Sequence, residues 1–239
     1  MIIESPDHDI PLSELSDQHV ERILLTWQDR IRDLRKDDRF RYILVFKNHG
    51  MSAGASLAHP HTQLIATPVT PLNVARELES CRVHFNAKER CLYCDIIAQE
   101  LAIGDRIVHI DDKYVVMTPF ASRFPFETLI APLHHQHDFT SVTPEDMSSL
   151  ARTLKATLQK LKISLNDPPY NFVLHNAPNT ESIYPWRPGY WETLKYDFHW
   201  HIEVIPSLTK VAGFEWGTGF YINPTTPEDA AEYLRNVDI

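Results

Sequence analysis

The sequence lacks the features that mark membrane-bound, exported and nucleic-acid-binding proteins. No apolar run reaches the roughly 18 residues that a membrane helix needs, and residues 1–20 are acidic where a leader would have a basic start and an apolar stretch. Lys and Arg number 23 against 32 Asp and Glu, and the net charge of -9 disfavours binding to a phosphate backbone, although one local nucleotide pocket is compatible with it. We expect a cytoplasmic protein with no membrane or nucleic-acid partner.

Cysteine is also scarce. Three cysteines in 239 residues argue against a disulfide framework, and two of them form the pair Cys91 and Cys94. A Cys-x-x-Cys pair in a reducing compartment is typical of metal binding. We expect Cys81 to be an ordinary thiol.

The first part of the chain combines a helix, a strand and a histidine pair. Ser16 is a plausible cap for a helix whose apolar residues share one face. The β-branched and aromatic segment 42–46 predicts a strand, and the turn 48–50 leads from it to His59-Pro60-His61. A further histidine, His8, precedes the helix.

The same order returns downstream. The segment 143–146 opens a second amphipathic helix, 170–175 predicts a strand, and 176–178 is typical of a turn. A strand that begins with His199-Trp200-His201 follows, and its alternation puts both histidines on one face. The repeat predicts two copies of one α+β unit, with antiparallel sheets and packed helices.

The two copies differ in completeness. The second has three leading strands ahead of its helix, at 106–110, 114–118 and 126–131. The first has no counterpart of these strands or of the Cys-x-x-Cys pair. We therefore expect a partial unit at 1–67, a connection with a short helix at 68–90, and a complete unit at 91–239. The proline-rich stretch 178–190 is typical of a loop, and we expect Trp186 to be a packing residue.

The first histidine pair is suited to phosphorus chemistry. Because His59 and His61 lie two residues apart on an extended backbone, their side chains face the same way, and one can bind a metal while the other attacks phosphorus. A neutral imidazole attacking a phosphoryl centre gives a phosphoramidate intermediate, which predicts ping-pong kinetics. Gln63 lies on the same face.

The loop ahead of this pair is rich in small residues. Asn48, Gly54 and Ser56 could bring backbone amides and a hydroxyl group against a phosphate. The pair and the loop together predict a site for a phosphate-containing substrate.

Several long segments carry a resemblance to a known family. Ser5-Pro6-Asp7-His8, the run from Asn48 to Gln63 and the later His-Trp-His-Ile-Glu resemble the galactose-1-phosphate uridylyltransferases of the histidine-triad superfamily. The resemblance covers nearly the whole chain. The plant-type branch with ADP-glucose phosphorylase activity is similar as well, through 46–48, 52–56, 166–170 and 213–215.

The resemblance implies a duplicated histidine-triad fold and a covalent nucleotidyl intermediate on His61. In such a protein UMP moves from UDP-glucose, a nucleotide sugar, to a hexose 1-phosphate, a sugar phosphate. Asn48 and Gly54 would then help to bind the substrate, while Gln63 and Ser56 would hold the transferred phosphate. The segment Phe214-Glu215 would approach the hexose in a partner subunit, so a homodimer is expected.

The second copy also predicts a metal site. Cys91 and Cys94, with His135 and His199, would complete a closed, structural zinc site. His134 and His137 are rivals for the third ligand, and the family pattern favours His135. About one zinc per chain is therefore expected.

The family suggests two further metal arrangements. An iron site of some bacterial members would match Glu77, His175, His199 and His201. The family's other zinc takes two upstream cysteines together with the residues that match His8 and His59. This chain supplies only the two histidines, so that site would be half built.

Two other functions stay open at this point. ADP-glucose phosphorolysis or adenylyl transfer fits the plant-type matches, and the base contacts that would discriminate lie upstream of the residues present. A truncated, inactive chain that persists as a zinc-stabilised nucleotide-binding module is the third possibility.

Overall fold

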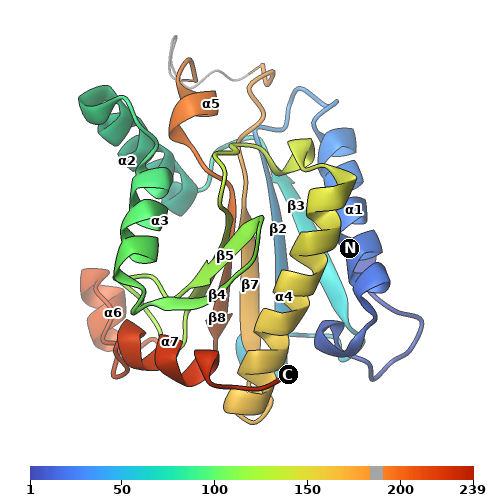
Figure 1. Ribbon diagram of the computed structural model, residues 1–239. Helices are drawn as coiled ribbons and strands as arrows, with labels where there is room; N and C mark the ends of the chain where they lie inside the picture. Colours follow the sequence, from blue (N-terminus) through green and yellow to red (C-terminus); the bar gives the residue numbers. More distant parts are fainter. Residues whose placement is uncertain (184–190) are drawn as a thin grey trace.

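The computed structural model describes residues 1–183 and 191–239 (Figure 1). Part of the stretch 178–190, which was predicted to be a loop, lies outside the described residues, and so does Trp186, which was predicted to be a packing residue. No helix in the described ranges is long and apolar enough to cross a membrane.

In the described residues eight strands form one antiparallel sheet in the order β1-β3-β2-β7-β8-β6-β5-β4. The strands are β1 (Ile2–Ile3), β2 (Tyr42–His49), β3 (His61–Thr67), β4 (Ile107–Ile110), β5 (Tyr114–Met117), β6 (Thr128–Pro132), β7 (Tyr170–His175) and β8 (His201–Pro206). The sheet is continuous across the two predicted units because β2 pairs with β7.

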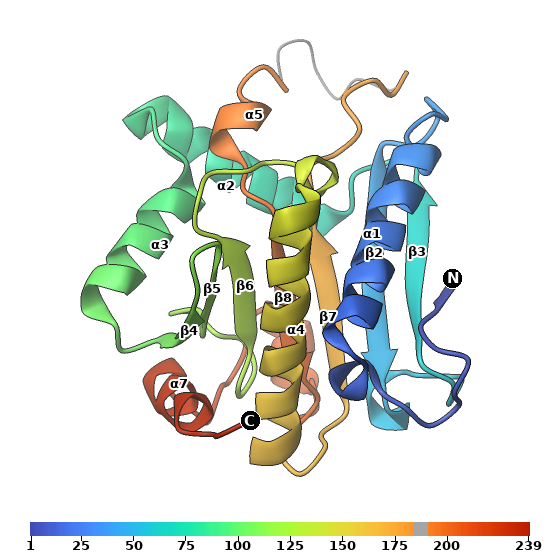
Figure 2. The ribbon, with the colours of Figure 1, turned by 45° about the vertical axis from the view of Figure 1, so that its right-hand side comes forward.

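Helices cover both faces of the sheet, with α1 and α4 on one side and α2 and α3 on the other (Figures 1 and 2). The helices are α1 (Asp17–Leu34), α2 (Leu72–Lys88), α3 (Leu92–Ile103), α4 (Pro144–Ser164), α5 (Leu194–Asp197), α6 (Gly213–Thr218) and α7 (Pro227–Arg235). The predicted α+β class with an antiparallel sheet and packed helices is confirmed. The prediction of a short helix in the connection is wrong, because α2 has 17 residues.

Local signals explain where the two long core helices begin. The Ser16 side chain accepts a hydrogen bond from the backbone N–H of His19, and Thr143 accepts one from Asp146 in the same way. The apolar faces of α1 and α4 then bury a shared core against the sheet, in which Trp27 contacts Phe172. This core fixes the strands that carry both histidine pairs.

The repeat is visible in the strand registers. The first repeat is β1-α1-β2-β3 and the second is β6-α4-β7-β8. Ile2 lies opposite Thr62, and Ile130 lies opposite Ile202, so Thr62 and Ile202 occupy equivalent places. His61 of the first repeat therefore corresponds to His201 of the second. In the second repeat β5 and β4 continue the sheet beyond β6, and the described residues contain no counterpart of these strands beyond β1, the equivalent of β6.

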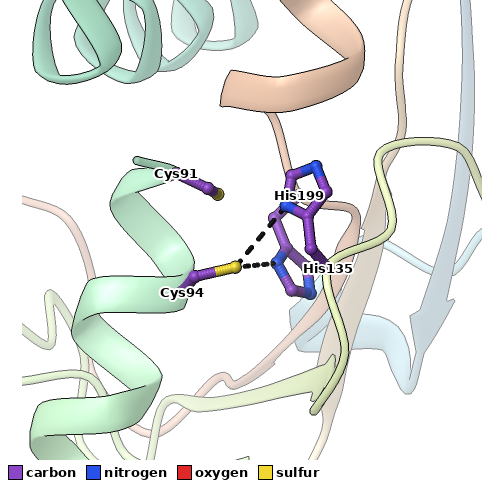
Figure 3. A group of neighbouring side chains, drawn as sticks. All are labelled: Cys91, Cys94, His135 and His199. Carbon is purple, nitrogen blue, oxygen red and sulfur yellow. Dashed lines mark hydrogen bonds between the residues drawn. The ribbon is translucent and has the colours of Figure 1, made fainter. Parts of the chain in front are cut away.

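On the face away from α1 and α4, a smaller core holds α3 against the second repeat. Ile97 of α3 packs with Val115, Met117, Leu129 and Ala131 of the sheet. This packing brings the start of α3, where Cys91 and Cys94 lie, close to His199, which precedes β8 (Figure 3).

Candidate functional site

His61 is the first residue of β3, and its ring is fixed in one tautomer. The Nδ1 atom lies 2.8 Å from the carbonyl oxygen of His59. Because a carbonyl only accepts, Nδ1 must carry the proton of the neutral ring, and Nε2 keeps its lone pair. The residue as a whole is only 3% exposed. An imidazole held in this way can act as a nucleophile through Nε2.

His61 borders a cavity of about 400 Å³ at the end of β2. Of the residues predicted from the sequence, Asn48 and Ser56 line the same cavity. Gln63 lies two residues further along β3, on the same face as His61. The cavity is large enough for a phosphorylated sugar or part of a nucleotide.

The loop between β2 and β3 needs two glycines. Gly50 has a φ of 81°, and a Cβ atom there would lie 2.9 Å from Cβ of Pro169. Gly54 has a φ of 88°, and its carbonyl oxygen accepts a hydrogen bond from Nδ2 of Asn48. Because other residues adopt such positive φ values only with strain, these positions hold the loop in its tight shape.

Asn171 was not predicted from the sequence. Its Nδ2 atom donates to Oδ1 of Asn48 at 2.7 Å and to the carbonyl oxygen of Ala53 at 2.8 Å, so it orients Asn48 and ties down the loop. Asn171 lies on β7, opposite Asn48 in the register. No local pattern in the sequence indicates this pairing across more than 120 residues.

The predicted hexose contacts lie apart from this cavity. Phe214 and Glu215 are on α6, and neither lines the cavity of His61. Glu215 accepts a hydrogen bond from the backbone N–H of Ala212, and Phe214 is half-exposed. Their contact with a substrate in a partner subunit stays a prediction.

The four predicted zinc ligands come together from three parts of the chain (Figure 3). The ligand atoms of Cys91, Cys94, His135 and His199 all lie within 4.8 Å of one another. Sγ of Cys94 is 3.5 Å from Nδ1 of both histidines. The geometry brings His135, rather than its rivals His134 and His137, into the cluster.

The surroundings of this cluster suit a metal. Nε2 of His135 donates to the carbonyl oxygen of Lys195 and Nε2 of His199 to that of Pro132, both at 3.0 Å, so each Nδ1 lone pair faces the sulfurs. The hydrogen bond between the two cysteines, helped by bonds from the two histidines to Cys91, holds the pKa of Cys91 well below its usual range and raises that of Cys94. Zinc would displace the remaining thiol proton, and two thiolates with two imidazoles form a donor set that binds zinc.

His8 and His59 form a smaller pair near the start of the chain. Their Nδ1 atoms lie 3.1 Å apart, and Nε2 of His59 donates to the carbonyl oxygen of Ser5 at 2.7 Å. No group of three potential ligands forms around them in the described part of the chain. Two converging nitrogens are half of a tetrahedral site.

A separate cluster consists of Glu77 from α2, His175 from β7 and His201 from β8. His199 is not part of it, so the four residues of the alternative iron set are not assembled as one group. Nδ1 of His175 lies 2.7 Å from a Glu77 carboxylate oxygen, and Nε2 lies 3.4 Å from Glu203. An imidazole ring between two carboxylates is a stable cation.

This cluster predicts a pH dependence of stability. Burial alone would lower the pKa of His175, but Glu77 and Glu203 raise it to about 10 from the ordinary 6.5. Because the folded-state pKa is raised, the stabilisation is complete below pH 6.5 and is lost as pH rises toward 10. We expect the thermal midpoint to fall by at least about 4 °C between pH 7 and pH 10, since 1 kcal/mol shifts it by about 2–4 °C at this size.

Calorimetry of the parent and of His175→Asn over this pH range checks the prediction. The slope should flatten in His175→Asn, while His84→Gln, which removes a partly exposed histidine 2.9 Å from the single carboxylate of Asp95, should keep the parent slope. Parallel profiles for the parent and His175→Asn would contradict it.

An α+β sheet with a His-x-His pair beside a cavity large enough for a phosphorylated sugar is the arrangement of a nucleotidyltransferase-like protein. Comparison with known families agrees, since residues 1–71 match the N-terminal domain and residues 77–238 the C-terminal domain of galactose-1-phosphate uridyl transferase. The chain belongs to this family.

The relatives of this chain are named for two different activities. An ADP-glucose phosphorylase from Arabidopsis thaliana is 37% identical over 241 residues, which cover all of this chain and 64% of the relative. A galactose-1-phosphate uridylyltransferase from Thermotoga maritima is 30% identical over 246 residues, covering all of this chain and 74% of the relative. A crystal structure of the Arabidopsis thaliana ADP-glucose phosphorylase with bound ADP-glucose has a TM-score of 0.89 at 36% identity, over 99% of this chain and 72% of that one.

Proposed function

We propose that the protein transfers an adenylyl group from ADP-glucose through His61. The observation that carries the proposal is the His61 ring, whose Nδ1 is held by the His59 carbonyl and whose Nε2 is therefore free to attack a substrate in the adjoining cavity. Asn48 and Ser56 line that cavity and offer an amide and a hydroxyl group to a phosphate.

The reaction has two balanced steps. In the first, Nε2 of His61 forms a bond to the α-phosphorus of ADP-glucose, the bond from this phosphorus to the bridging oxygen breaks, and glucose 1-phosphate leaves. In the second, inorganic phosphate attacks the same phosphorus, the P–N bond breaks, and ADP leaves. The covalent adduct divides one difficult transfer into two easier ones.

The choice of an adenine nucleotide over a uridine nucleotide rests on the sequence similarity of the chain to its relatives. The sequence led us to expect uridylyl transfer first, but the ADP-glucose phosphorylase is 37% identical to the chain and the uridylyltransferase 30%. Because of the similarity to the uridylyltransferase, transfer of UMP from UDP-glucose to a hexose 1-phosphate is the alternative function. The chain spans 64% of the length of the phosphorylase, so the activity of the whole protein is part of the proposal.

The proposal also covers the metal, the oligomeric state and the cellular location of the protein. Zinc, about one per chain, would stabilise the second repeat through Cys91, Cys94, His135 and His199. A homodimer would bring Phe214 and Glu215 to the hexose of a neighbouring subunit, and the cytoplasm would supply the nucleotide sugar and phosphate.

The test is to incubate the protein with ADP-glucose or UDP-glucose carrying a radioactive α-phosphate. We expect acid-labile label on the protein from ADP-glucose, release of one glucose 1-phosphate per labelled chain, and loss of the label when phosphate is added. More rapid labelling by UDP-glucose would favour the uridylyl alternative. No label from either donor would favour the nucleotide-binding module instead.

A further inference from the structure

A buried ion pair lies against the peptide of His61, and its lysine, Lys47, is also one of the residues that border the cavity. Nζ of Lys47 lies 2.7 Å from a Glu4 carboxylate oxygen, and the two side chains are 1% and 0% exposed. The other Glu4 oxygen accepts a hydrogen bond from the Thr62 hydroxyl at 2.6 Å. Glu4, Lys47 and Thr62 therefore form a closed polar triad inside the core.

The triad holds three consecutive residues of the histidine segment. Nζ of Lys47 donates to the carbonyl oxygen of His61 at 3.3 Å, and the backbone N–H of Glu4 donates to that of Pro60 at 3.1 Å. Thr62 is held through its own side chain. The backbone that carries the His61 ring is thus tied on both sides of Cα.

The second repeat has apolar residues at all three equivalent positions. Phe46 lies opposite Gln63 and Val173 opposite Glu203, so Lys47 and Leu174, each one residue further along its strand, correspond. Thr62 corresponds to Ile202, and Glu4, two residues after Ile2, corresponds to Pro132, two after Ile130.

Leu174, Ile202 and Pro132 are all buried. The same arrangement of strands is therefore built elsewhere in this chain without any charge. A buried ion pair is often no more stabilising than apolar side chains of similar volume, because both charges lose their hydration. Stability of the fold does not explain why the first repeat keeps the triad.

The two histidines differ in how their rings are held. His201 has the same Nδ1 bond to a carbonyl, from His199 at 3.1 Å, but its Nε2 also lies 3.5 Å from the Tyr93 hydroxyl and 3.6 Å from Glu77. His61 borders the cavity, and in the proposed reaction its Nε2 must keep a free lone pair. The orientation of His61 therefore depends on its backbone.

We propose that Glu4, Lys47 and Thr62 are positioning residues that fix the His61 peptide so that Nε2 points at the α-phosphorus of the bound nucleotide. This inference rests on the proposed function. Reaction rates are sensitive to small errors of position, and a displacement of 1 Å can cost about a hundredfold.

The test gives the first repeat the apolar residues of the second, in the triple variant Glu4→Leu/Lys47→Leu/Thr62→Ile. Leucine replaces Glu4 because proline would remove the N–H that Pro60 needs. We expect an unchanged or higher melting temperature, an unchanged KM for ADP-glucose and labelling of His61 that is about a hundredfold slower. Nitrogen NMR of the His61 ring should show the single Nδ1–H tautomer of the parent replaced by a mixture.

A matched control removes another buried ion pair, in Glu100→Leu/Arg106→Leu, whose parent side chains are 5% and 8% exposed. This control should keep the parent rate and tautomer. Parent-like labelling and tautomer in the triple variant would overturn the proposal, and so would slower labelling accompanied by a lower melting temperature. If the parent itself takes no label, the proposed function fails, and the tautomer measurement alone decides the positioning role.

Discussion

His61→Ala is expected to abolish nucleotidylation of the chain. The attacking Nε2 atom disappears, and the other histidine of the pair cannot replace it, because Nε2 of His59 donates to the Ser5 carbonyl and its Nδ1 faces His8. Loss of a nucleophile costs on the order of 10⁴- to 10⁶-fold in rate. The measurement is the radioactive label retained from ADP-glucose after denaturation, together with the rate of glucose 1-phosphate release.

The control for this prediction is His109→Ala, an exposed histidine on β4 away from the cavity, which should label like the parent. His61→Ala should also keep the parent melting temperature within a few degrees, so that the loss of label is not a loss of fold. If His61→Ala takes up label at the parent rate, another residue is the nucleophile.

Removal of zinc is expected to destabilise the chain strongly. Cys91 and Cys94 connect the start of α3 to the loop of His135 and to His199 just ahead of β8, so the metal joins three segments that are distant in sequence. Zinc at about 1000 times its Kd would contribute about 4 kcal/mol. At about 2–4 °C per kcal/mol, chelation should lower the melting temperature by about 8–16 °C.

Metal content and calorimetry check this prediction together. The parent should bind about one zinc, and Cys94→Ser should bind much less and melt like the chelated parent. Cys81→Ala is the matched control, because Cys81 is buried outside the cluster and its variant should keep the zinc. A metal-free parent with an unchanged melting temperature would contradict the assignment.

Much of the site follows from local sequence patterns. The alternation along β3 puts His61 and Gln63 on one face, and the caps at Ser16 and Thr143 mark the helices that hold the sheet. The zinc cluster was predicted from the Cys-x-x-Cys pair together with the family pattern, and the structure brings its four members together. Each of these signals is contained in a short stretch of chain or in a long motif.

Other contacts of the site could not be predicted, because no local pattern in the sequence indicates them. Asn171 orients Asn48, and Glu77 lies against His175, because β7 is paired with β2 and α2 is packed behind β8. The length of α2 was underestimated because only three of its residues are buried, which leaves little apolar periodicity to detect. Strand order and helix packing join segments about 100 residues apart.

The repeat and the shared face of His59 and His61 were thus readable in the order of residues, since a strand's alternation and a helix's periodicity are local consequences of backbone geometry, whereas the choice of His61 as nucleophile came from the family resemblance and stays a prediction. The tautomer of His61, the separation of His199 from Glu77 and the triad against the His61 peptide emerged only on folding. Each depends on which groups, distant in sequence, are buried together in the folded chain. A buried charge or polar atom without a partner costs free energy, so such groups lie next to groups that can pair with them.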